Sequence, residues 1–512
     1  MLFSSWQFIF VFLPVTVSGF FLIPSRSGAL RKIWLLLTSI YFYAYWKVEY
    51  LPLLFFSIVF NYSVAEVMAR HRGGRTARLA IYFGMGVNLL LLSYYKYTNF
   101  VAHSLGLIVK HDVGPFDIVL PLAISFFTFT QISYLVDVYR DQTLHYRFLD
   151  YALFVLFFPH LIAGPIVRHW EIIPQYAERA LRADRTDLSV GLAFFLIGLY
   201  KKVLLADNLA GYVASVYGAA TQGTVLSCFD AWLGTIAFGL QIYFDFSGYS
   251  DMAIGLARMF GIKFPMNFNS PYQAGSIIEF WRRWHMSLTR FLREYVYFPL
   301  GGNRRGPRRQ ALNIMGTFLL SGLWHGAGWN FVVWGGLHGL FLAVASRWRA
   351  LVQQWEWRTQ RWAYRAASGV LTFLLITLTW AFFRAPKLSV ATRVVASMCG
   401  QHGLTIPESL RGVPGSRLLT HVGAHFVPHN LQVPSYQSVL LLTSVMALIA
   451  VFFPNSQQCL AGFGPVLEKV ELRPGLQLKL RLADGIALGG LFFWVVRSYY
   501  ASPPSPFLYF NF

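Results

Sequence analysis

The chain has 512 residues, of which 56% are hydrophobic and only 13% are charged, and its formal net charge is +21 at pH 7. This polar fraction is too small to cover a water-soluble globular protein, so lipid must surround most of the chain. Because the Arg and Lys residues lie between apolar segments, their charge indicates membrane topology and contact with anionic membrane lipids, and we expect no nucleic-acid partner.

Apolar segments of near-spanning length, about 20 residues, recur from the beginning of the chain to its end. They predict an all-α polytopic membrane protein with a single membrane-embedded domain over residues 1–512. In chain order, the segments expected to span the membrane or to re-enter it are 6–23, 33–46, 51–68, 79–95, 116–138, 151–167, 188–204, 231–260, 311–324, 331–346, 367–383, 437–453 and 486–499.

Several of these segments are too short to span a bilayer unaided, or contain Pro and Gly, as in Phe158-Pro159-His160. Broken backbone at membrane depth is tolerated only where protein buries it or where it lines a wet cavity. We therefore expect a cavity-forming helical bundle with re-entrant helices.

Basic clusters predict the orientation of the segments, because cytoplasmic loops carry an excess of Lys and Arg. The last two clusters bracket a helical hairpin whose turn, residues 323–330, then lies at membrane depth. By the same count the N-terminus and the polar connection 386–436 are extracytoplasmic, and residues 437–512 form C-terminal membrane helices. The clusters placed in the cytoplasm are Arg26, Arg31 and Lys32; Arg70, Arg72, Arg75 and Arg78; Arg304, Arg305, Arg308 and Arg309; and Arg347, Arg349, Arg358, Arg361 and Arg365.

His325, in the turn of this hairpin, is the strongest candidate for a catalytic residue. Burying an ionisable side chain inside a membrane costs free energy, so such a residue indicates a function. Gly322, Gly326 and Gly328 surround it and would let backbone or substrate approach closely. A neutral imidazole could take a proton from a hydroxyl that attacks an acyl carbon and return it to the leaving group. The alternative is a histidine that only packs between helices.

A second group of candidates lies in residues 279–305, where charges are spaced as in a helix: Glu279 with Arg283, and Arg290 with Glu294. With aromatic residues between these charges, the segment predicts an amphipathic helix at the cytoplasmic interface that carries His285. Its arginines could bind the phosphates of a coenzyme A nucleotide, or they could contact lipid headgroups.

Other polar residues in apolar segments are weaker candidates. His338 lies beside three glycines on one helical face, so tight helix packing explains it well. Asp245 and Asp251, with Ser247 between them, lie inside an apolar segment, where they would either neutralise buried arginines or line the cavity.

The sequence gives little support for a metal site or a nucleotide-binding motif. His421, His425 and His429 are spaced by four residues, but their setting among Gly, Pro and Asn favours a solvated loop, and we expect no metal site. The three cysteines are scattered and predict neither a disulfide framework nor a zinc site. A Walker loop, a dinucleotide glycine fingerprint and Gly-x-Ser-x-Gly are absent from the sequence, which argues against ATP hydrolysis and a redox cofactor.

Residues 280–288, 301–305 and 323–326 resemble the signatures of the membrane-bound O-acyltransferase (MBOAT) family, and the similarity is greatest to its bacterial alginate O-acetylation branch. The resemblance covers a family-like core of about residues 1–385 and is specific for the family, although not for one polysaccharide. Further similar stretches are 1–5, 120–127, 132–140, 158–165, 243–255, 267–272 and 380–384.

The resemblance implies a multi-helix fold in which a cytoplasmic and an extracytoplasmic funnel meet at a central tunnel. It also implies that His325 of the Trp-His-Gly motif is the essential catalytic residue and that His285 of the Arg-Trp-His-x-Ser motif lies near the same passage. The residues expected to bind acetyl-CoA or to line the tunnel are Arg282, Arg283, Asn303, Arg304, Trp324 and Asn330.

The implied reaction moves an acetyl group from cytoplasmic acetyl-CoA across the bacterial inner membrane. A periplasmic acetyltransferase acceptor protein and the polysaccharide biosynthesis machinery would then O-acetylate a polymer such as alginate or cellulose. Acetyl-CoA is the donor substrate, and no cofactor is expected. His325 could act as a general base in direct transfer, which we favour, or carry the acetyl group covalently. The connection 386–436 faces the side where the acceptor would dock.

Two other functions fit parts of the sequence. One is D-alanyl transfer to a cell-envelope polymer from a carrier protein, against which the chain length and the motifs argue. The other is a non-enzymatic transporter or flippase, which would also be a basic bundle with broken helices and buried charges. The sequence shows no inverted repeat, and transport gives no role to the pair of His285 and His325.

Overall fold

The computed structural model of the chain describes residues 1–512 except 112, 141–145, 177–180, 182, 355–361, 413–419, 422, 428–430, 432–434, 473–475, 502–504, 506 and 509–512, and it does not describe the side chains of 354 and 499–501. Three residues named above, Arg358, Arg361 and His429, lie outside the described residues. The chain divides into two compact units, one of residues 1–199, 249–266 and 456–494, and one of residues 200–248, 267–455 and 495–512. That the chain forms one membrane-embedded domain stays a prediction.

The regular secondary structure in the described residues of the first unit is all helical. Its first elements are η1 (Phe8–Phe12), α1 (Leu13–Leu22), α2 (Gly28–Ala44), η2 (Val48–Tyr50), α3 (Leu51–Arg70), α4 (Arg75–Leu92), η3 (Ser93–Tyr97), α5 (Thr98–Val109) and α6 (Ile124–Arg140). They are followed by α7 (Phe148–Leu156), α8 (Phe158–Leu161), α9 (His169–Ile172), η4 (Ile173–Tyr176), α10 (Arg185–Tyr200), α21 (Ser456–Cys459), η9 (Ala461–Phe463) and α22 (Leu482–Ala501).

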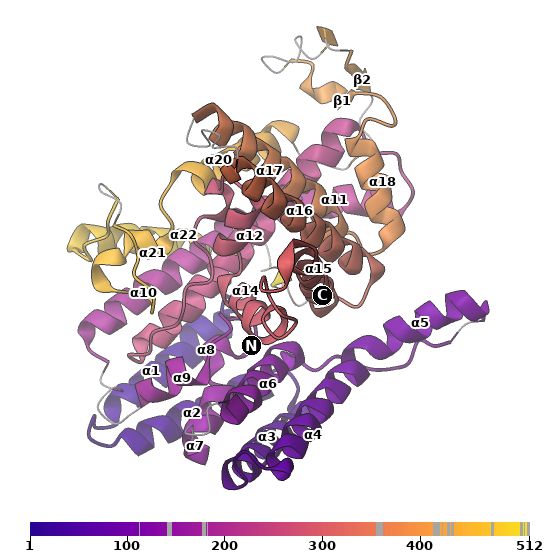
Figure 1. Ribbon diagram of the computed structural model, residues 1–512. Helices are drawn as coiled ribbons and strands as arrows, with labels where there is room; N and C mark the ends of the chain where they lie inside the picture. Colours follow the sequence, from indigo (N-terminus) through magenta and orange to yellow (C-terminus); the bar gives the residue numbers. More distant parts are fainter. Residues whose placement is uncertain are drawn as a thin grey trace. The chain divides into compact units, whose positions relative to one another are not determined.

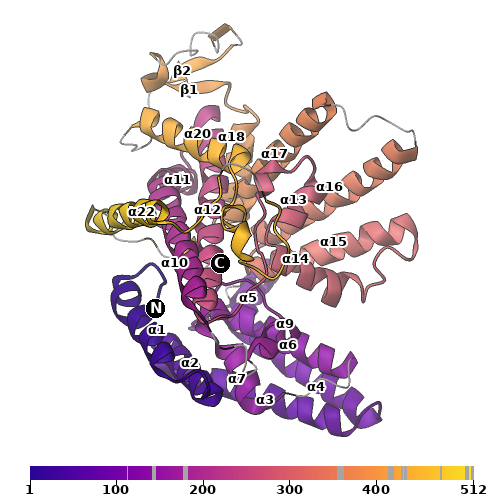
Figure 2. The same cartoon turned by 90° about the vertical axis from the view of Figure 1, so that its left-hand side faces the viewer.

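Helices α3, α4 and α6 of this unit lie side by side (Figures 1 and 2). Their apolar surface provides no hydrogen bonds for the two buried amides Asn61 and Asn88, which therefore bond to each other across the α3/α4 contact at 2.7 and 3.3 Å. Each amide also donates to a carbonyl one turn earlier on its own helix. A buried amide is stable in such a place only when its polar atoms are paired.

The second unit contains the hairpin predicted from the sequence. Its elements are η5 (Lys201–Ala206), α11 (Asp207–Thr221), α12 (Cys228–Met259, which continues into the first unit), η6 (Pro271–Gln273), α13 (Ile277–Arg283), α14 (Met286–Leu292), η7 (Arg293–Tyr297) and α15 (Gly306–His325). They are followed by α16 (Trp329–Gln354), α17 (Trp362–Arg384), α18 (Leu388–Met398), β1 (Thr405–Pro407), η8 (Glu408–Leu410), β2 (His425–Val427) and α20 (Tyr436–Phe452).

The chain is a multi-pass membrane protein, as its composition predicts. Five helical stretches among the described residues are long and apolar enough to cross a membrane: Val48–Arg70, Arg75–Val109, Arg185–Thr221, Trp329–Gln353 and Trp362–Arg384. Shorter apolar helices cover Phe8–Leu22, Leu388–Met398 and Tyr436–Phe452. The all-α prediction is confirmed apart from β1 and β2, a pair of three-residue parallel strands. Re-entrant helices, the tunnel and the orientation stay predictions.

Three sequence-based expectations were wrong in detail. The segment 116–138 is not one helix, because α6 begins only at Ile124. The connection 386–436 is not only a loop, since it contains α18 and both strands. Residues 279–305 do not form one amphipathic helix: α13 ends at Arg283 and α14 begins at Met286, with His285 in the left-handed backbone region between them (φ +42°). The expected pair of Glu279 and Arg283 is confirmed at 2.7 Å.

Helices α15 and α16 pack against each other over their length (Figures 1 and 2). Their backbones meet at Gly322 and Gly335, where a side-chain carbon on either residue would overlap a carbonyl oxygen of the facing helix. Such contact needs small residues, since the helix axes cannot approach this closely with a Cβ between them. Gly336, the next residue on α16, has room, because an added Cβ would lie 3.6 Å from a Leu319 methyl group.

Gly322→Ala should destabilise the protein by about 2 kcal/mol or more, because the new methyl group must push α15 and α16 apart. Gly336→Ala is the matched control and should melt within about 0.5 kcal/mol of wild type. Thermal unfolding of the purified variants in detergent measures both. Equal melting temperatures for the two variants would contradict the close packing.

Candidate functional site

His325 ends α15 and is buried, with 5% of its surface exposed. Its ring lies among aromatic rings, with centroids 4.9 Å from Trp324, 5.0 Å from Trp334 on α16 and 5.4 Å from Phe383 on α17. Gly326 follows in an extended conformation, and a Cβ there would overlap the Phe331 ring, so the chain can turn tightly at this point only with glycine. The hairpin therefore places an imidazole in an apolar setting.

His285 is held by a small polar network between α13 and α14. Its Nδ1 lies 3.0 Å from the side-chain oxygen of Asn267, which also accepts a hydrogen bond from the Ser287 hydroxyl at 2.8 Å. Because that amide oxygen only accepts, the Nδ1 of His285 must carry the hydrogen, and Nε2 is left as the basic nitrogen. A left-handed backbone is uncommon for histidine, and such strain persists only where surrounding contacts enforce it.

The two histidines, which we call the histidine pair, come together although 40 positions separate them in the chain. Their ring centroids are 6.5 Å apart. His285 lies outside the five membrane-spanning stretches, and its complete burial lowers its pKa from 6.5 to about 3. Two charged imidazolium rings this close would repel strongly in an apolar environment, so the pair holds at most one extra proton.

Two buried hydrogen-bond donors lie beside His325. Ser321 lies one turn before it on α15, and Trp334 packs against its ring. Neither the Ser321 hydroxyl nor the indole N–H of Trp334 has a hydrogen-bond partner among the residues that the structure describes. Unpaired buried donors are rare and need an explanation, and a substrate carbonyl is one partner that they could bind.

His338 has a different setting, since both of its ring nitrogens are used within the protein. The Trp281 indole donates to Nδ1 at 3.2 Å, and Nε2 donates to the Thr379 hydroxyl at 3.0 Å, because that hydroxyl gives its own hydrogen to a backbone carbonyl. These bonds join α13, α16 and α17. The lower rank that the sequence gave His338 agrees with this packing role.

The six residues predicted to bind substrate fall into two places. Trp324 and Asn330 are buried near the histidine pair, with the Trp324 ring 6.3 Å from that of His285. The Asn330 amide donates to the carbonyls of Phe382 and Ala385, so it also ties α16 to the end of α17. The other four lie nearer the surface: Arg282, Asn303 and Arg304 are exposed, and Arg283 is half-buried beside Glu279.

One interpretation of the sequence had the buried carboxylates of α12 neutralising arginines, but the partner found for Asp245 is a lysine. Asp245 pairs with Lys202 at 2.7 Å. Asp251 accepts hydrogen bonds from Ser456 and Gln457, which carry no charge. The sequence did not indicate lysine as the partner, because Lys202 is remote in the chain and lies in an apolar segment.

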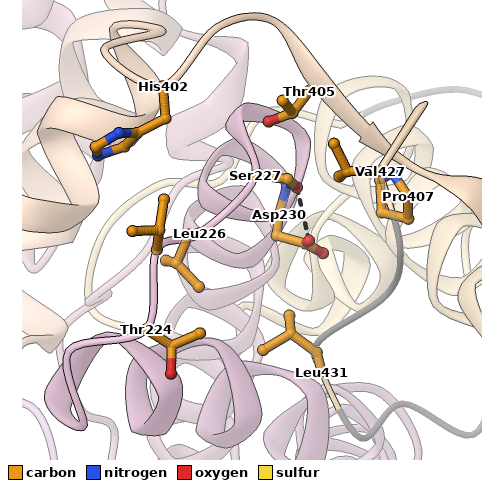
Figure 3. Close-up of a pocket in the computed structure, with 10 residues that line it drawn as sticks. Thr224, Leu226, Ser227, Asp230, His402, Thr405, Pro407, Val427 and Leu431 are labelled. Atoms are coloured by element: carbon orange, nitrogen blue, oxygen red, sulfur yellow. Dashed lines mark hydrogen bonds between the residues drawn. The ribbon is translucent and has the colours of Figure 1, made fainter. Parts of the chain in front are cut away.

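A pocket of about 270 Å³ lies elsewhere in the second unit and contains neither histidine of the pair (Figure 3). Its polar centre, Asp230, accepts hydrogen bonds from Ser227, Tyr212 and Tyr436, so this carboxylate fastens α11, α12 and α20 together. Among the described residues, no group of three side chains could hold a metal ion.

Sequence reasoning missed Asn267, Ser321 and Trp334 as members of the site. Asn267 could have been found, because it opens one of the stretches that resemble the family and precedes the His285 motif by only 18 positions. Nothing in the sequence distinguished Ser321 or Trp334 from ordinary helix-packing residues. Helical spacing brings Ser321 near His325, whereas only the fold brings the Trp334 ring there.

The depressed pKa of His285 predicts how stability depends on pH. Above pH 6.5 residue 285 is neutral in both states, but as the pH falls towards 3 only the unfolded chain takes up the proton, so stability is lost in that window. Between pH 7.5 and pH 5 wild type should lose about 2 kcal/mol more than His285→Asn, which cannot titrate and tolerates left-handed backbone. Unfolding in detergent at the two pH values measures this, and equal losses would contradict a buried neutral imidazole.

Comparison with known proteins agrees with this geometry. A model of the membrane-bound O-acyltransferase family matches residues 139–385, which include the histidine pair. The chain is 38% identical to the peptidoglycan O-acetyltransferase of Helicobacter pylori, over 100% of this chain and 98% of that protein. It is 43% identical to the probable alginate O-acetylase AlgI of Azotobacter vinelandii, over 78% of each chain.

Similarity to a third protein is weaker. The teichoic acid D-alanyltransferase of Bacillus subtilis is 29% identical over 44% of this chain and 59% of its own length. The resemblance found in the sequence motifs is thus confirmed by full-length similarity. The chain belongs to the membrane-bound O-acyltransferase family and is an O-acyltransferase enzyme.

Proposed function

We propose that this chain takes an acetyl group from acetyl-CoA on the cytoplasmic side of the bacterial inner membrane and delivers it for O-acetylation of an extracytoplasmic polysaccharide. The observation that carries the proposal is the histidine pair, with a neutral His285 and a buried His325 whose rings are 6.5 Å apart. The names of the two most similar relatives described above support acetyl as the group transferred.

In the proposed reaction His325 is the general base. It takes the proton of the acceptor hydroxyl while the hydroxyl oxygen bonds to the acetyl carbon, and the carbon–sulfur bond of the thioester then breaks. The proton passes to the departing sulfur, so coenzyme A leaves as the thiol. The cycle needs only one mobile proton, which agrees with a histidine pair that cannot hold two extra protons.

Ser321 and Trp334 are proposed to stabilise the oxygen of the attacked carbonyl. That oxygen gains negative charge in the transition state, and donors already fixed around it contribute most in a water-poor site. Trp324 and Asn330 would line the passage. The exposed Arg282, Asn303 and Arg304, with Arg283, would bind the phosphates of coenzyme A.

Peptidoglycan is the acceptor polymer that the comparisons favour. The peptidoglycan enzyme of H. pylori matches the chain over its full length, whereas the similarity to the alginate enzyme of A. vinelandii covers 78% of it. Alginate or cellulose remains the alternative polymer. A periplasmic acetyltransferase would be the partner that receives the acetyl group.

D-alanyl transfer is the second enzymatic candidate, supported by the weaker match to the teichoic acid enzyme. A transporter or flippase is a third, because the buried charges of the helices would also suit one. Purified protein in proteoliposomes separates the acetyltransferase from both alternatives, since only the acetyltransferase should release free coenzyme A from acetyl-CoA.

His325→Ala should abolish coenzyme A release, with kcat reduced by a factor of about 1,000, because it removes the proposed general base. The measurement is thiol release from acetyl-CoA by the purified protein with its extracytoplasmic partner. His338→Gln is the matched control: it loses a buried hydrogen bond and about 1–3 kcal/mol of stability but should retain turnover per folded molecule. Equal loss in both variants would contradict the assignment of the base.

Trp334→Phe should lower kcat by a factor of about 100 and leave the KM for acetyl-CoA unchanged, because it removes one donor to the transition state and keeps the aromatic ring. Steady-state kinetics on protein of matched melting temperature tests this. A variant with wild-type kcat would exclude the indole N–H from the reaction.

A further inference from the structure

Lys202 is a buried charge that the proposed reaction does not use. It lies within the spanning stretch Arg185–Thr221 and is only 3% exposed. Its ammonium group pairs with Asp207 and with Asp245 on α12, each at 2.7 Å. Placing an ionisable residue inside a membrane-spanning segment costs free energy, so the partners of this residue indicate its role.

The fourth partner in this cluster comes from the end of the chain. The Ser505 hydroxyl accepts from the Lys202 ammonium at 2.9 Å and donates to Asp207 at 2.5 Å. The backbone N–H of Leu508 donates to the second oxygen of Asp245 at 3.0 Å. We call the described residues Ser505, Phe507 and Leu508 the C-terminal segment. Through Ser505 and Leu508 this segment is bound to all three charged side chains.

Charge balance explains why the cluster needs this segment. One ammonium faces two carboxylates, the buried Asp245 and the partly exposed Asp207, so the cluster has one excess negative charge that further donors stabilise. The Ser505 hydroxyl and the Leu508 N–H are such donors. Hydrogen bonds to charged groups are about twice as strong as neutral ones, which makes this a firm attachment.

The same segment contacts the wall of the catalytic site. Phe507 is buried, and its ring centroid is 5.7 Å from that of Phe246, the residue next to Asp245 on α12. Phe246 in turn meets the ring of His285 edge to face, with centroids 4.7 Å apart and an interplanar angle of 82°. A continuous path of contacts therefore runs from the ionic cluster through Phe507 to His285.

We propose that Lys202, Asp207 and Asp245 form an anchor that holds the C-terminal segment against Phe246, so that the segment fixes the position of the His285 ring. The anchor and Phe507 are positioning elements and do not touch the reacting atoms. The inference rests on the proposed function for its effect on turnover, but not for the attachment of the segment or its effect on His285.

The test uses the full chain with Ser505→Ala, which removes the bridging hydroxyl without adding bulk or charge. Ser505→Thr is the matched control, because it retains the hydroxyl. Phe507→Leu keeps the segment apolar and its ionic contacts intact but removes the ring that touches Phe246. Lys202→Met is a poorer choice, since two bare carboxylates would remain buried and the protein could fail to fold.

Two measurements do not depend on catalysis. Hydrogen exchange of the C-terminal peptide should be slow in wild type, Ser505→Thr and Phe507→Leu, and faster by about tenfold in Ser505→Ala. The ¹⁵N-histidine resonance of His285, identified by its loss in His285→Asn, should shift in Ser505→Ala and in Phe507→Leu and stay unchanged in Ser505→Thr. Fast exchange in wild type, or a His285 resonance that none of the changes moves, would overturn the proposal.

Turnover provides the third measurement. In Ser505→Ala and Phe507→Leu, kcat per folded molecule should fall about tenfold while the KM for acetyl-CoA stays at the wild-type value, and Ser505→Thr should retain wild-type kcat. Wild-type kcat in both variants would overturn the positioning role. If wild type itself released no coenzyme A, the proposed function would fail, and the exchange and resonance measurements would still decide the anchor.

Discussion

The backbone contact between α15 and α16 at Gly322 and Gly335 is the constraint on which the geometry around His325 depends. Because glycine has no Cβ, the two helices come close enough for each glycine to lie against a carbonyl oxygen of the facing helix. This separation is short enough for the three residues Gly326–Gly328 to join the helices. The tight turn then fixes where α15 ends, and with it the direction of the His325 ring between Trp334 and Phe383.

The second histidine is positioned beside the first by a different structural feature. A break between α13 and α14 leaves His285 in left-handed backbone, and the Asn267 amide fixes both the orientation of its ring and the nitrogen that carries the hydrogen. Burial then keeps this imidazole neutral well below physiological pH. A neutral His285 places no positive charge beside His325, the proposed general base, so it does not oppose the uptake of a proton there.

Buried polar groups of this protein are satisfied in sets, as an apolar chain requires. His338 uses both ring nitrogens between three helices, and Asp230 takes hydrogen bonds from three hydroxyl groups. The Lys202 cluster follows the same rule with charges, and it includes the end of the chain. Ser321 and Trp334, beside the histidine in the Trp-His-Gly turn, are among the exceptions in the part of the chain that the structure describes, as are Tyr176, Gln241 and Thr443. For the two donors beside His325 the proposed reaction supplies a partner, the oxygen of the attacked carbonyl.

The sequence by itself determined the membrane class and most of the helices, and it singled out His325 and His285 as candidates, because these follow from apolar runs, glycine positions and local motifs. It also predicted the hairpin around residues 323–330, since the glycines that allow it are close together in the chain. Only the tertiary structure decided that the two histidines meet, that Asn267 orients one of them, and that Lys202 joins Asp245 to Ser505. These relations join residues 18 to 303 positions apart. Local patterns cannot specify such pairs, because the packing of whole helices determines which distant side chains become neighbours.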